Sequence, residues 1–155
     1  MQVGAFEHLK VVHVAPDGTA STTYALGAGT TDVNSSAVDA LGFDKIAFLV
    51  TFGDNADTAT YTGTIEGSAN GSTGWTEITS ANDSFTAGAA DTDNEMLGVQ
   101  CKVNPSYRYY RLASNRGTAN TVIAALHALL SNGDNLPVTQ STAAGNFINT
   151  PTIVP

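Results

Sequence analysis

Side chains that could act as a general base or a nucleophile are few and widely separated in this sequence. His8, His13 and His127 fall in stretches that predict β-strands, and no serine or cysteine on a sharp turn accompanies them. Cys101, the one cysteine, alternates with polar neighbours, which predicts a small side chain on the core face of a strand. We therefore expect no catalytic residue and no enzymatic activity.

Acidic side chains gather in two places without the spacing of a metal site. Residues 91–95 read Asp-Thr-Asp-Asn-Glu and residues 54–57 read Asp-Asn-Ala-Asp, but neither has the central glycine and late glutamate of a calcium loop. A zinc site would need a second cysteine or two closely spaced histidines. Gly27–Gly29 lacks the helix and lysine of a phosphate-binding loop. We expect turns at both acidic segments, and no metal or cofactor.

Aromatic side chains offer a binding chemistry instead. Trp75 is the only tryptophan and follows a predicted hairpin, where it packs in the core or at its rim, or else stacks against a sugar ring as an exposed platform. Tyr109 is the second candidate for glycan stacking. Both interpretations of Trp75 are open at the level of the sequence.

Half of the basic residues lie close together. Arg108, Arg111 and Arg116 are three of the 6 lysines and arginines in a chain with 14 acidic residues. They either pair with acidic loops of their own chain or contact a partner subunit, where arginine and tyrosine are enriched.

Composition excludes several classes of partner. The 155 residues carry a net charge of −8, so binding to bare nucleic acid or to an anionic membrane would be electrostatically opposed. No window approaches the roughly 20 apolar residues of a membrane span. The first residues lack the basic start and apolar core of a signal peptide, and one cysteine permits no internal disulfide. We expect a soluble protein made without export.

The predicted elements that position these side chains are strands, organised around residues 41–77. Ile46, Phe48 and Val50 have one parity and Ala47, Leu49 and Thr51 the other, which predicts a strand buried on both faces. Residues 58–66 alternate between small or apolar and polar side chains, which predicts a strand with one wet face. Asn70–Gly71 marks the hairpin that returns the chain through Trp75.

Further strands are expected on both sides of this hairpin. Residues 79–95 are polar and predict a loop with a short strand at 84–86. Residues 121–131 suit a helix by composition but a paired strand by position, and we favour the strand. The other predicted strands cover residues 8–14, 21–26, 96–103 and 107–114, with a short strand or turn within 33–41.

Short strands separated by turns predict an all-β fold, a jelly-roll-like antiparallel β-sandwich. We expect an N-terminal arm at residues 1–7, the sandwich at 8–131 and an extended C-terminal arm at 132–155. The arm carries no charge after Asp134 yet holds widely spaced apolar residues: Leu136, Val138, Phe147, Ile148, Ile153 and Val154. These side chains are buried by a neighbouring subunit, or the segment is a free tail or a strand on its own domain.

Two family resemblances follow from these motifs. Residues 38–50 (VDALGFDKIAFLV), 53–54, 63–68 (GTIEGS) and 74–78 (GWTEI) resemble a group of small structural proteins of tailed bacteriophages, encoded near the major capsid protein. Residues 65–68, 74–78 and 107–112 (YRYYRL) are similar to the discoidin-like, galactose-binding jelly roll, although its terminal disulfide pair is absent. Both resemblances imply a jelly-roll-like sandwich.

The first resemblance implies a non-enzymatic virion protein. Such a protein would decorate or cement the exterior of a phage capsid at junctions between major capsid protein subunits, after assembly in the host bacterial cytoplasm. It would form a homo-oligomer, a dimer or trimer, with the arginines and the C-terminal arm contacting the capsid or a neighbour. The second resemblance implies the alternative, a carbohydrate-binding module in a phage fibre or head appendage.

Overall fold

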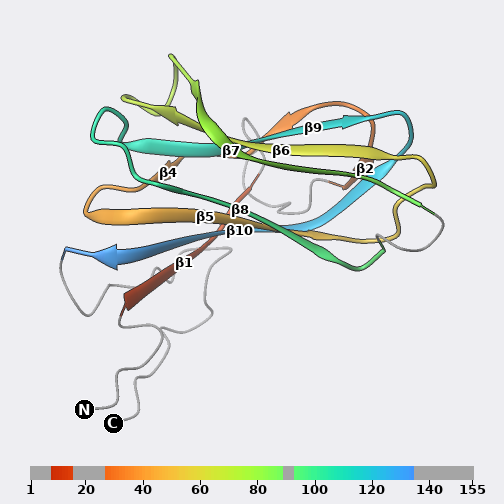
Figure 1. The fold of residues 1–155 in the computed structure, drawn as a ribbon, viewed down its shortest axis with the longest axis horizontal. Coiled ribbons are helices and arrows are strands. Elements are labelled where there is room, and N and C mark those ends of the chain that lie inside the picture. The colour runs from red at the N-terminus through yellow and green to blue at the C-terminus, as the bar shows by residue number, and fades with distance from the viewer. Residues whose placement is uncertain (1–7, 16–26, 89–92, 135–155) are drawn as a thin grey trace, which may run out of the picture.

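The computed structural model describes residues 8–15, 27–88 and 93–134, and this part of the chain forms two packed antiparallel sheets (Figure 1). It contains β-strands and no helix. The strands are β1 (Leu9–His13), β2 (Gly27–Gly29), β3 (Val33–Asn34), β4 (Val38–Asp39), β5 (Phe43–Phe52), β6 (Thr60–Ser68), β7 (Thr76–Thr86), β8 (Met96–Lys102), β9 (Tyr109–Gly117) and β10 (Thr121–Gly133).

The order of the strands is that of a jelly roll. One sheet runs β1-β10-β5-β8, with β2 also paired to β10, and the other runs β3-β9-β6-β7, with β4 also paired to β9. If β2 is counted with β1, and β3 with β4, eight strand positions, four in each sheet, form two interleaved Greek keys. The predicted all-β, jelly-roll-like sandwich is confirmed.

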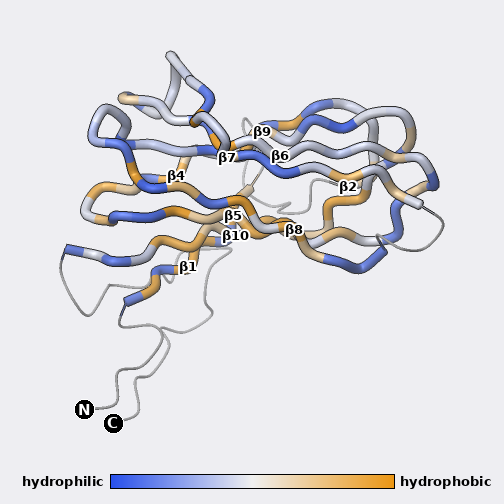
Figure 2. The backbone as a smooth tube through the Cα atoms, in the orientation of Figure 1, coloured by the Kyte–Doolittle hydropathy of each residue, from blue (hydrophilic) through white to orange (hydrophobic). Residues whose placement is uncertain are grey.

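The core lies between the sheets and follows from the alternation along each strand. Ile46, Phe48 and Val50 of β5 are fully buried, as are Tyr110 and Leu112 of β9. Figure 2 shows the most hydrophobic stretches on β5 and β10, whereas β6 and β9 are paler because threonines and other polar side chains alternate with their core residues.

Several local predictions are confirmed. Residues 121–131 lie in strand β10 rather than in a helix. Strand β6 has one buried face and one face partly exposed to solvent, and Val99 and Cys101 point inward from β8. The hairpin at Asn70–Gly71 joins β6 to β7, with Gly71 at a φ of 76°. The Asn70 side-chain oxygen accepts the backbone N–H groups of Ser72 and Thr73, which closes the turn locally.

Two predictions need correction. The loop expected at residues 79–95 is wrong in its first half, because β7 continues to Thr86 as an edge strand that needs only one apolar face. The second face of β5 is only half-buried, since Ala47, Leu49 and Thr51 lie on the outer side of an antiparallel sheet. Of the C-terminal arm predicted at 132–155, residues 132 and 133 belong to β10, and residues 135–155 lie outside the described residues. The N-terminal arm at 1–7, the strand predicted at 21–26 and residues 89–92 also lie outside them.

Candidate functional site

The outer face of the sheet β3/β4-β9-β6-β7 places polar side chains of three long strands in rows. The strand registers align Arg111 with Glu66 and Glu77, and Tyr109 with Ser68, which is buried and donates to the Thr73 carbonyl oxygen of the hairpin. Further along, the rows hold the following hydroxyl and amide side chains: Thr60, Thr62, Thr64, Asn82, Ser84, Thr86 and Asn115. This face is therefore a mostly uncharged surface rich in hydrogen-bonding groups.

Trp75 lies at one end of this face, directly before β7. The Arg111 guanidinium carbon is 4.4 Å from the centroid of its ring, and the Arg111 Nε donates to a Glu66 carboxylate oxygen at 2.7 Å. Because this ion pair is mostly shielded from water, with side-chain exposures of 14% for Arg111 and 22% for Glu66, it holds the guanidinium firmly over the indole.

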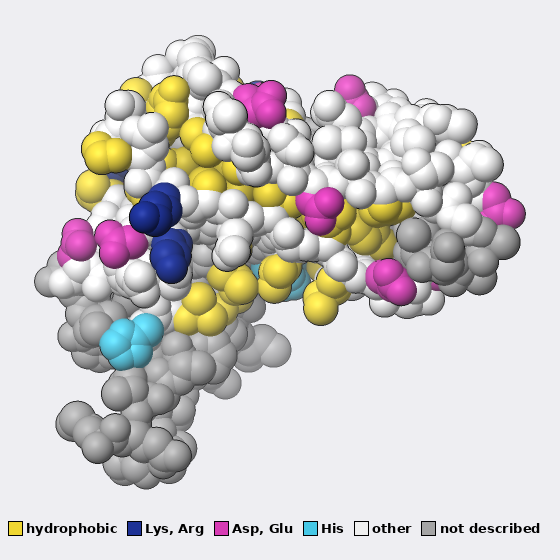
Figure 3. Space-filling model, in the orientation of Figure 1, with side chains coloured by type: hydrophobic (Ala, Val, Ile, Leu, Met, Phe, Trp, Pro, Cys, Tyr) yellow, Lys and Arg dark blue, Asp and Glu magenta, His cyan; other side chains and the backbone are white. Residues whose placement is uncertain are grey.

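Trp75 and Tyr109 do not belong to the hydrophobic core or to the half-buried residues packed against it. Tyr109 lies in β9, Trp75 directly precedes β7, and β6 runs between these two strands. Two strand spacings of a sheet therefore separate the two aromatic residues, about 10 Å. Figure 3 shows hydrophobic side chains exposed at the upper left, the end of the molecule where the β6–β7 hairpin lies in Figure 1. Both aromatics are half-buried.

Tyr109 is held between the hairpin and an ion pair. A Cβ added at Gly71 would lie 2.9 Å from the Tyr109 ring, so only glycine permits this close approach. Arg108 lies 5.2 Å from the ring centroid and binds Asp39 with two hydrogen bonds, of 3.0 and 2.7 Å. The bond from Arg108 lowers the pKa of Asp39 below its ordinary value, so this carboxylate is ionised at neutral pH.

Arg116 is placed differently from the other two arginines. It is 7% exposed, and its Nε donates to the Thr31 carbonyl oxygen at 2.8 Å. Its backbone N–H donates to a carboxylate oxygen of Asp32, and burial lowers the pKa of the guanidinium. All three predicted arginines thus have partners within their own domain, and their role at a partner subunit stays a prediction.

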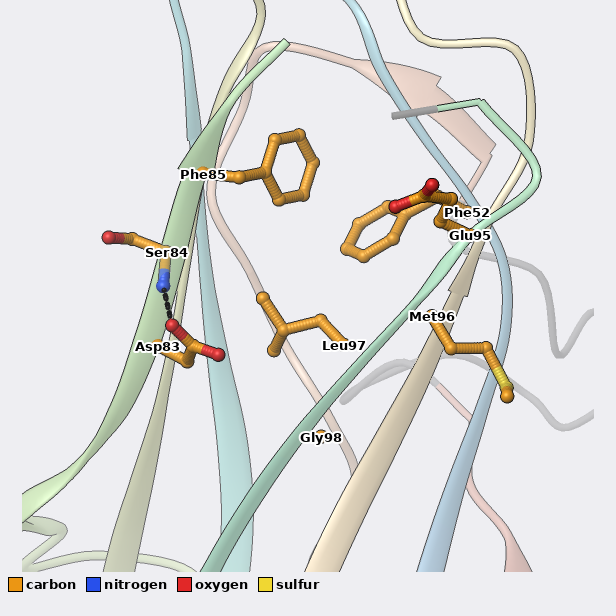
Figure 4. Close-up of a pocket in the computed structure, with 8 residues that line it drawn as sticks. All are labelled: Phe52, Asp83, Ser84, Phe85, Glu95, Met96, Leu97 and Gly98. Atoms are coloured by element: carbon orange, nitrogen blue, oxygen red, sulfur yellow. Dashed lines mark hydrogen bonds between the residues drawn. The ribbon is translucent and has the colours of Figure 1, made fainter. Parts of the chain in front are cut away.

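A pocket of about 250 Å³ opens at the edge of the sandwich between β7 and β8 (Figure 4). Phe52, Phe85 and Leu97 form its apolar part, while Asp83 and Glu95 lie at its rim. A second hollow of about 540 Å³ continues along the same edge, lined by residues of β7, by the end of β8 and by residues 103–105 after it. The edge therefore exposes part of the core, and Figure 3 shows it as a band of hydrophobic side chains between the layers.

The acidic and histidine side chains of the described residues do not gather into a metal-binding group. Within the described residues, no three His, Cys, Asp or Glu side chains are close enough to share a metal ion. His13 and His127 stack with ring centroids 4.7 Å apart, and burial, followed by the effect of His13, lowers the pKa of His127. The described residues also include no helix long and apolar enough to cross a membrane.

Sequence reasoning found Trp75, Tyr109 and the arginines but missed the carboxylates that hold them. Glu66 is 45 residues from Arg111, and Asp39 is 69 residues from Arg108. No local signal links such pairs, because only the strand register brings them together. The predicted apolar contacts of the C-terminal arm lie outside the described residues: Leu136, Val138, Phe147, Ile148, Ile153 and Val154.

Comparison with known proteins yields likeness of fold at low identity. No family model and no curated protein matches the sequence. A solved structure of Eiger TNF from S. frugiperda is 7% identical, with a TM-score of 0.39, and the match covers 86% of this chain and 99% of that chain. The C-terminal family 22 carbohydrate-binding module of Clostridium thermocellum Xyn10B is 12% identical, with a TM-score of 0.39, and the match covers 85% of this chain and 98% of that chain.

A third structure, the xylan-binding module CBM15, is 11% identical over 86% of this chain and 97% of that chain, with a TM-score of 0.38. The chain is thus weakly similar to jelly-roll-like β-sandwich modules, some of which bind carbohydrate. Likeness at this level identifies neither a family nor a ligand. Function must therefore be inferred from the residues of this chain.

Proposed function

We propose that this protein is a non-catalytic binding module that holds a neutral glycan on the outer face of the sheet β3/β4-β9-β6-β7. One observation carries the proposal: Trp75 lies outside the core and is fixed by Arg111, which Glu66 holds in turn. A tryptophan that contributes little to the core, yet is held in one orientation, is a preorganised contact for a ligand.

The chemistry of this face suits a sugar. The C–H bonds on one side of a pyranose ring pack against an aromatic ring, while its hydroxyl groups exchange hydrogen bonds with side-chain hydroxyls and amides. Trp75 and Tyr109 supply aromatic rings, and β6, β7 and β9 supply hydroxyl and amide rows on the same face, beyond the row of Arg111, Glu66 and Glu77.

A neutral ligand is favoured over an anionic one. The arginines closest to the two aromatic residues are each neutralised by a carboxylate, Arg111 by Glu66 and Arg108 by Asp39. The net charge of −8 would oppose the approach of a polyanion.

Substitution of Trp75 tests the proposal. Full-length protein would be applied to an array of neutral glycans, and the best ligand would then be titrated against wild type and Trp75→Ala. We expect affinity to fall about 30-fold, because an aromatic contact at the centre of a site contributes roughly 2 kcal/mol. Met96→Ala is the matched control, since Met96 is 68% exposed and lies on the other sheet.

The stability of the variant separates a ligand contact from a structural one. Loss of the contact between the indole and the Arg111 guanidinium should lower the free energy of unfolding by about 1 kcal/mol, leaving Trp75→Ala folded. An unfolded Trp75→Ala variant, or wild type that binds no neutral glycan, would contradict the proposal.

A second candidate is the decoration of a phage capsid, favoured by the chemistry of the opposite outer face. On the sheet β1-β10-β5-β8 this face aligns Val11 with Leu129 and Ala47, and His127 with Leu49. Apolar side chains in neighbouring rows suit contact with a protein, here the major capsid protein. The same candidate places the protein on the exterior of a virion.

Truncation tests this second candidate. Purified protein ending at Asp134 would be compared with the full chain for co-sedimentation with tailed-phage shells and for native mass. If residues 135–155 form an assembly arm, the truncated chain stays folded but loses the shell or its oligomeric state. Full occupancy of shells by the truncated protein would refute the role of the arm.

A further inference from the structure

Strand β8 is a long and regular sheet edge. Among the described residues it pairs only with β5, in an unbroken register from Lys45 opposite Lys102 to Thr51 opposite Met96. Residues 96–101 of this strand carry no charge, and Met96 is 68% exposed. An edge with an unbroken register and no charge over residues 96–101 is a template for pairing with another strand.

The other edges in the described part of the chain are poorer templates. The register of β7 breaks between Thr64 and Glu66 of β6, and its Ser80 has a φ of 64°, so this edge is bent away from regular pairing. On the remaining edges β1 has 5 residues, β2 has 3, and β3 and β4 have 2 each. Short or bulged strands are how sheets avoid edge pairing.

The hydrogen bonds at the two ends of β8 show which backbone groups face outward. The Phe52 N–H donates to the Glu95 carbonyl oxygen at 2.9 Å, and the Val103 N–H donates to the Asp44 carbonyl oxygen at 2.8 Å. Bonded residues alternate along an antiparallel strand, so positions 97, 99 and 101 bond to β5. The N–H and C=O groups of Gly98 and Gln100 therefore point toward the open side.

We infer that β8 pairs antiparallel with β8 of a second copy of this chain, around a two-fold axis at Val99. In this register Gly98 and Gln100 of opposite copies form hydrogen-bonded pairs, and so do Met96 and Lys102. Val99 faces Val99 of the second copy as a non-hydrogen-bonded pair. The contact joins the two β1-β10-β5-β8 sheets into one continuous sheet, an isologous dimer.

The charges at the two ends of β8 complement each other under this symmetry. Lys45 and Lys102 lie opposite each other at one end, while Glu95 precedes the other end and Asp83 lies beside it across the pocket (Figure 4). Antiparallel pairing brings the basic end of each copy to the acidic end of the other, whereas parallel pairing would oppose like charges. Complementary ends therefore favour this orientation.

The dimer goes beyond the proposed glycan site, because the two features lie on different sheets. Trp75 and Tyr109 belong to the outer face of β3/β4-β9-β6-β7, whereas the two-fold axis passes through the edge of the other sheet. Glycan binding and dimerisation can each fail without the other.

A proline at the outward-facing position tests the pairing. Sedimentation analysis would compare full-length wild type, Gln100→Pro and Gln100→Ala at micromolar to submillimolar concentration, with circular dichroism as the check of folding. The Gln100 N–H does not bond to β5, so proline is tolerated there by the fold. We expect wild type and Gln100→Ala to form dimers, and Gln100→Pro to associate at least about 30-fold more weakly, because two symmetry-related hydrogen bonds are lost.

A cysteine on the two-fold axis tests the register, and does not depend on how well the proline variant folds. Non-hydrogen-bonded partners have Cα atoms about 4.5 Å apart, within the range of a disulfide. Val99→Cys should form a covalent dimer under mild oxidation, while Cys101 in wild type lies opposite Leu97 of the second copy and should not. A monomeric wild type, a folded Gln100→Pro variant that dimerises as wild type does, or a Val99→Cys dimer without the disulfide would overturn the inference.

Discussion

Arg116 and Arg108 are a matched pair for testing how the fold uses its arginines. Arg116 is 7% exposed and its Nε donates to the Thr31 carbonyl oxygen at 2.8 Å, whereas the side chain of Arg108 is 47% exposed. Alanine at position 116 would remove a charged hydrogen bond to a backbone carbonyl, worth about 1.5–3 kcal/mol. It would also leave space beside Gly29, whose added Cβ would lie 3.3 Å from the guanidinium.

Together these effects predict that Arg116→Ala lowers the free energy of unfolding by about 2–4 kcal/mol. Arg108→Ala should leave it nearly unchanged, because its ion pair with Asp39 is exposed to water. Urea unfolding followed by tryptophan fluorescence measures the free energy of unfolding of both variants. If the slope of this free energy against urea concentration is the same as in wild type, the same surface is exposed on unfolding.

The pair also separates a structural role from a role at a partner. If Arg116 works within its own domain, its loss lowers stability at every protein concentration. Equal and small effects of both substitutions would refute the reasoning, as would a loss from Arg116→Ala that appears only under conditions where the protein is oligomeric.

Two further predictions concern the core. Burial raises the pKa of Tyr61 to about 12, above its unfolded value near 10, so its stabilising contribution is complete below pH 10 and is lost as the pH rises toward 12. Wild type should lose about 3 kcal/mol more than Tyr61→Phe over that interval in urea unfolding, and parallel curves would contradict this. Gly67→Ala should cost about 1–3 kcal/mol in the same assay, because its Cβ would lie 2.6 Å from the Tyr107 ring; an unchanged midpoint would show that the ring can move away.

Local pattern was sufficient for most of the fold. Strand parity in β5, β6, β8 and β9 follows from alternation, because successive side chains of a strand point to opposite faces. Alternation did not predict β7, because a polar edge strand with one shallow apolar face has the composition of a loop. Alternation also showed that Ala47, Leu49 and Thr51 share a face, but not how much of that face is buried, which depends on what packs against the sheet.

Part of the candidate surface could likewise be predicted from the sequence, and part could not. Trp75, Tyr109 and the arginines were identifiable from residue type alone, since each carries its chemistry in its own side chain. Only the tertiary structure decided that Glu66 holds Arg111 over Trp75, that Asp39 binds Arg108, and that Arg116 is buried. The physical reason is that a side chain's parity is set by its own strand, whereas its cross-strand neighbour is set by sheet order and register, which join residues far apart in the chain.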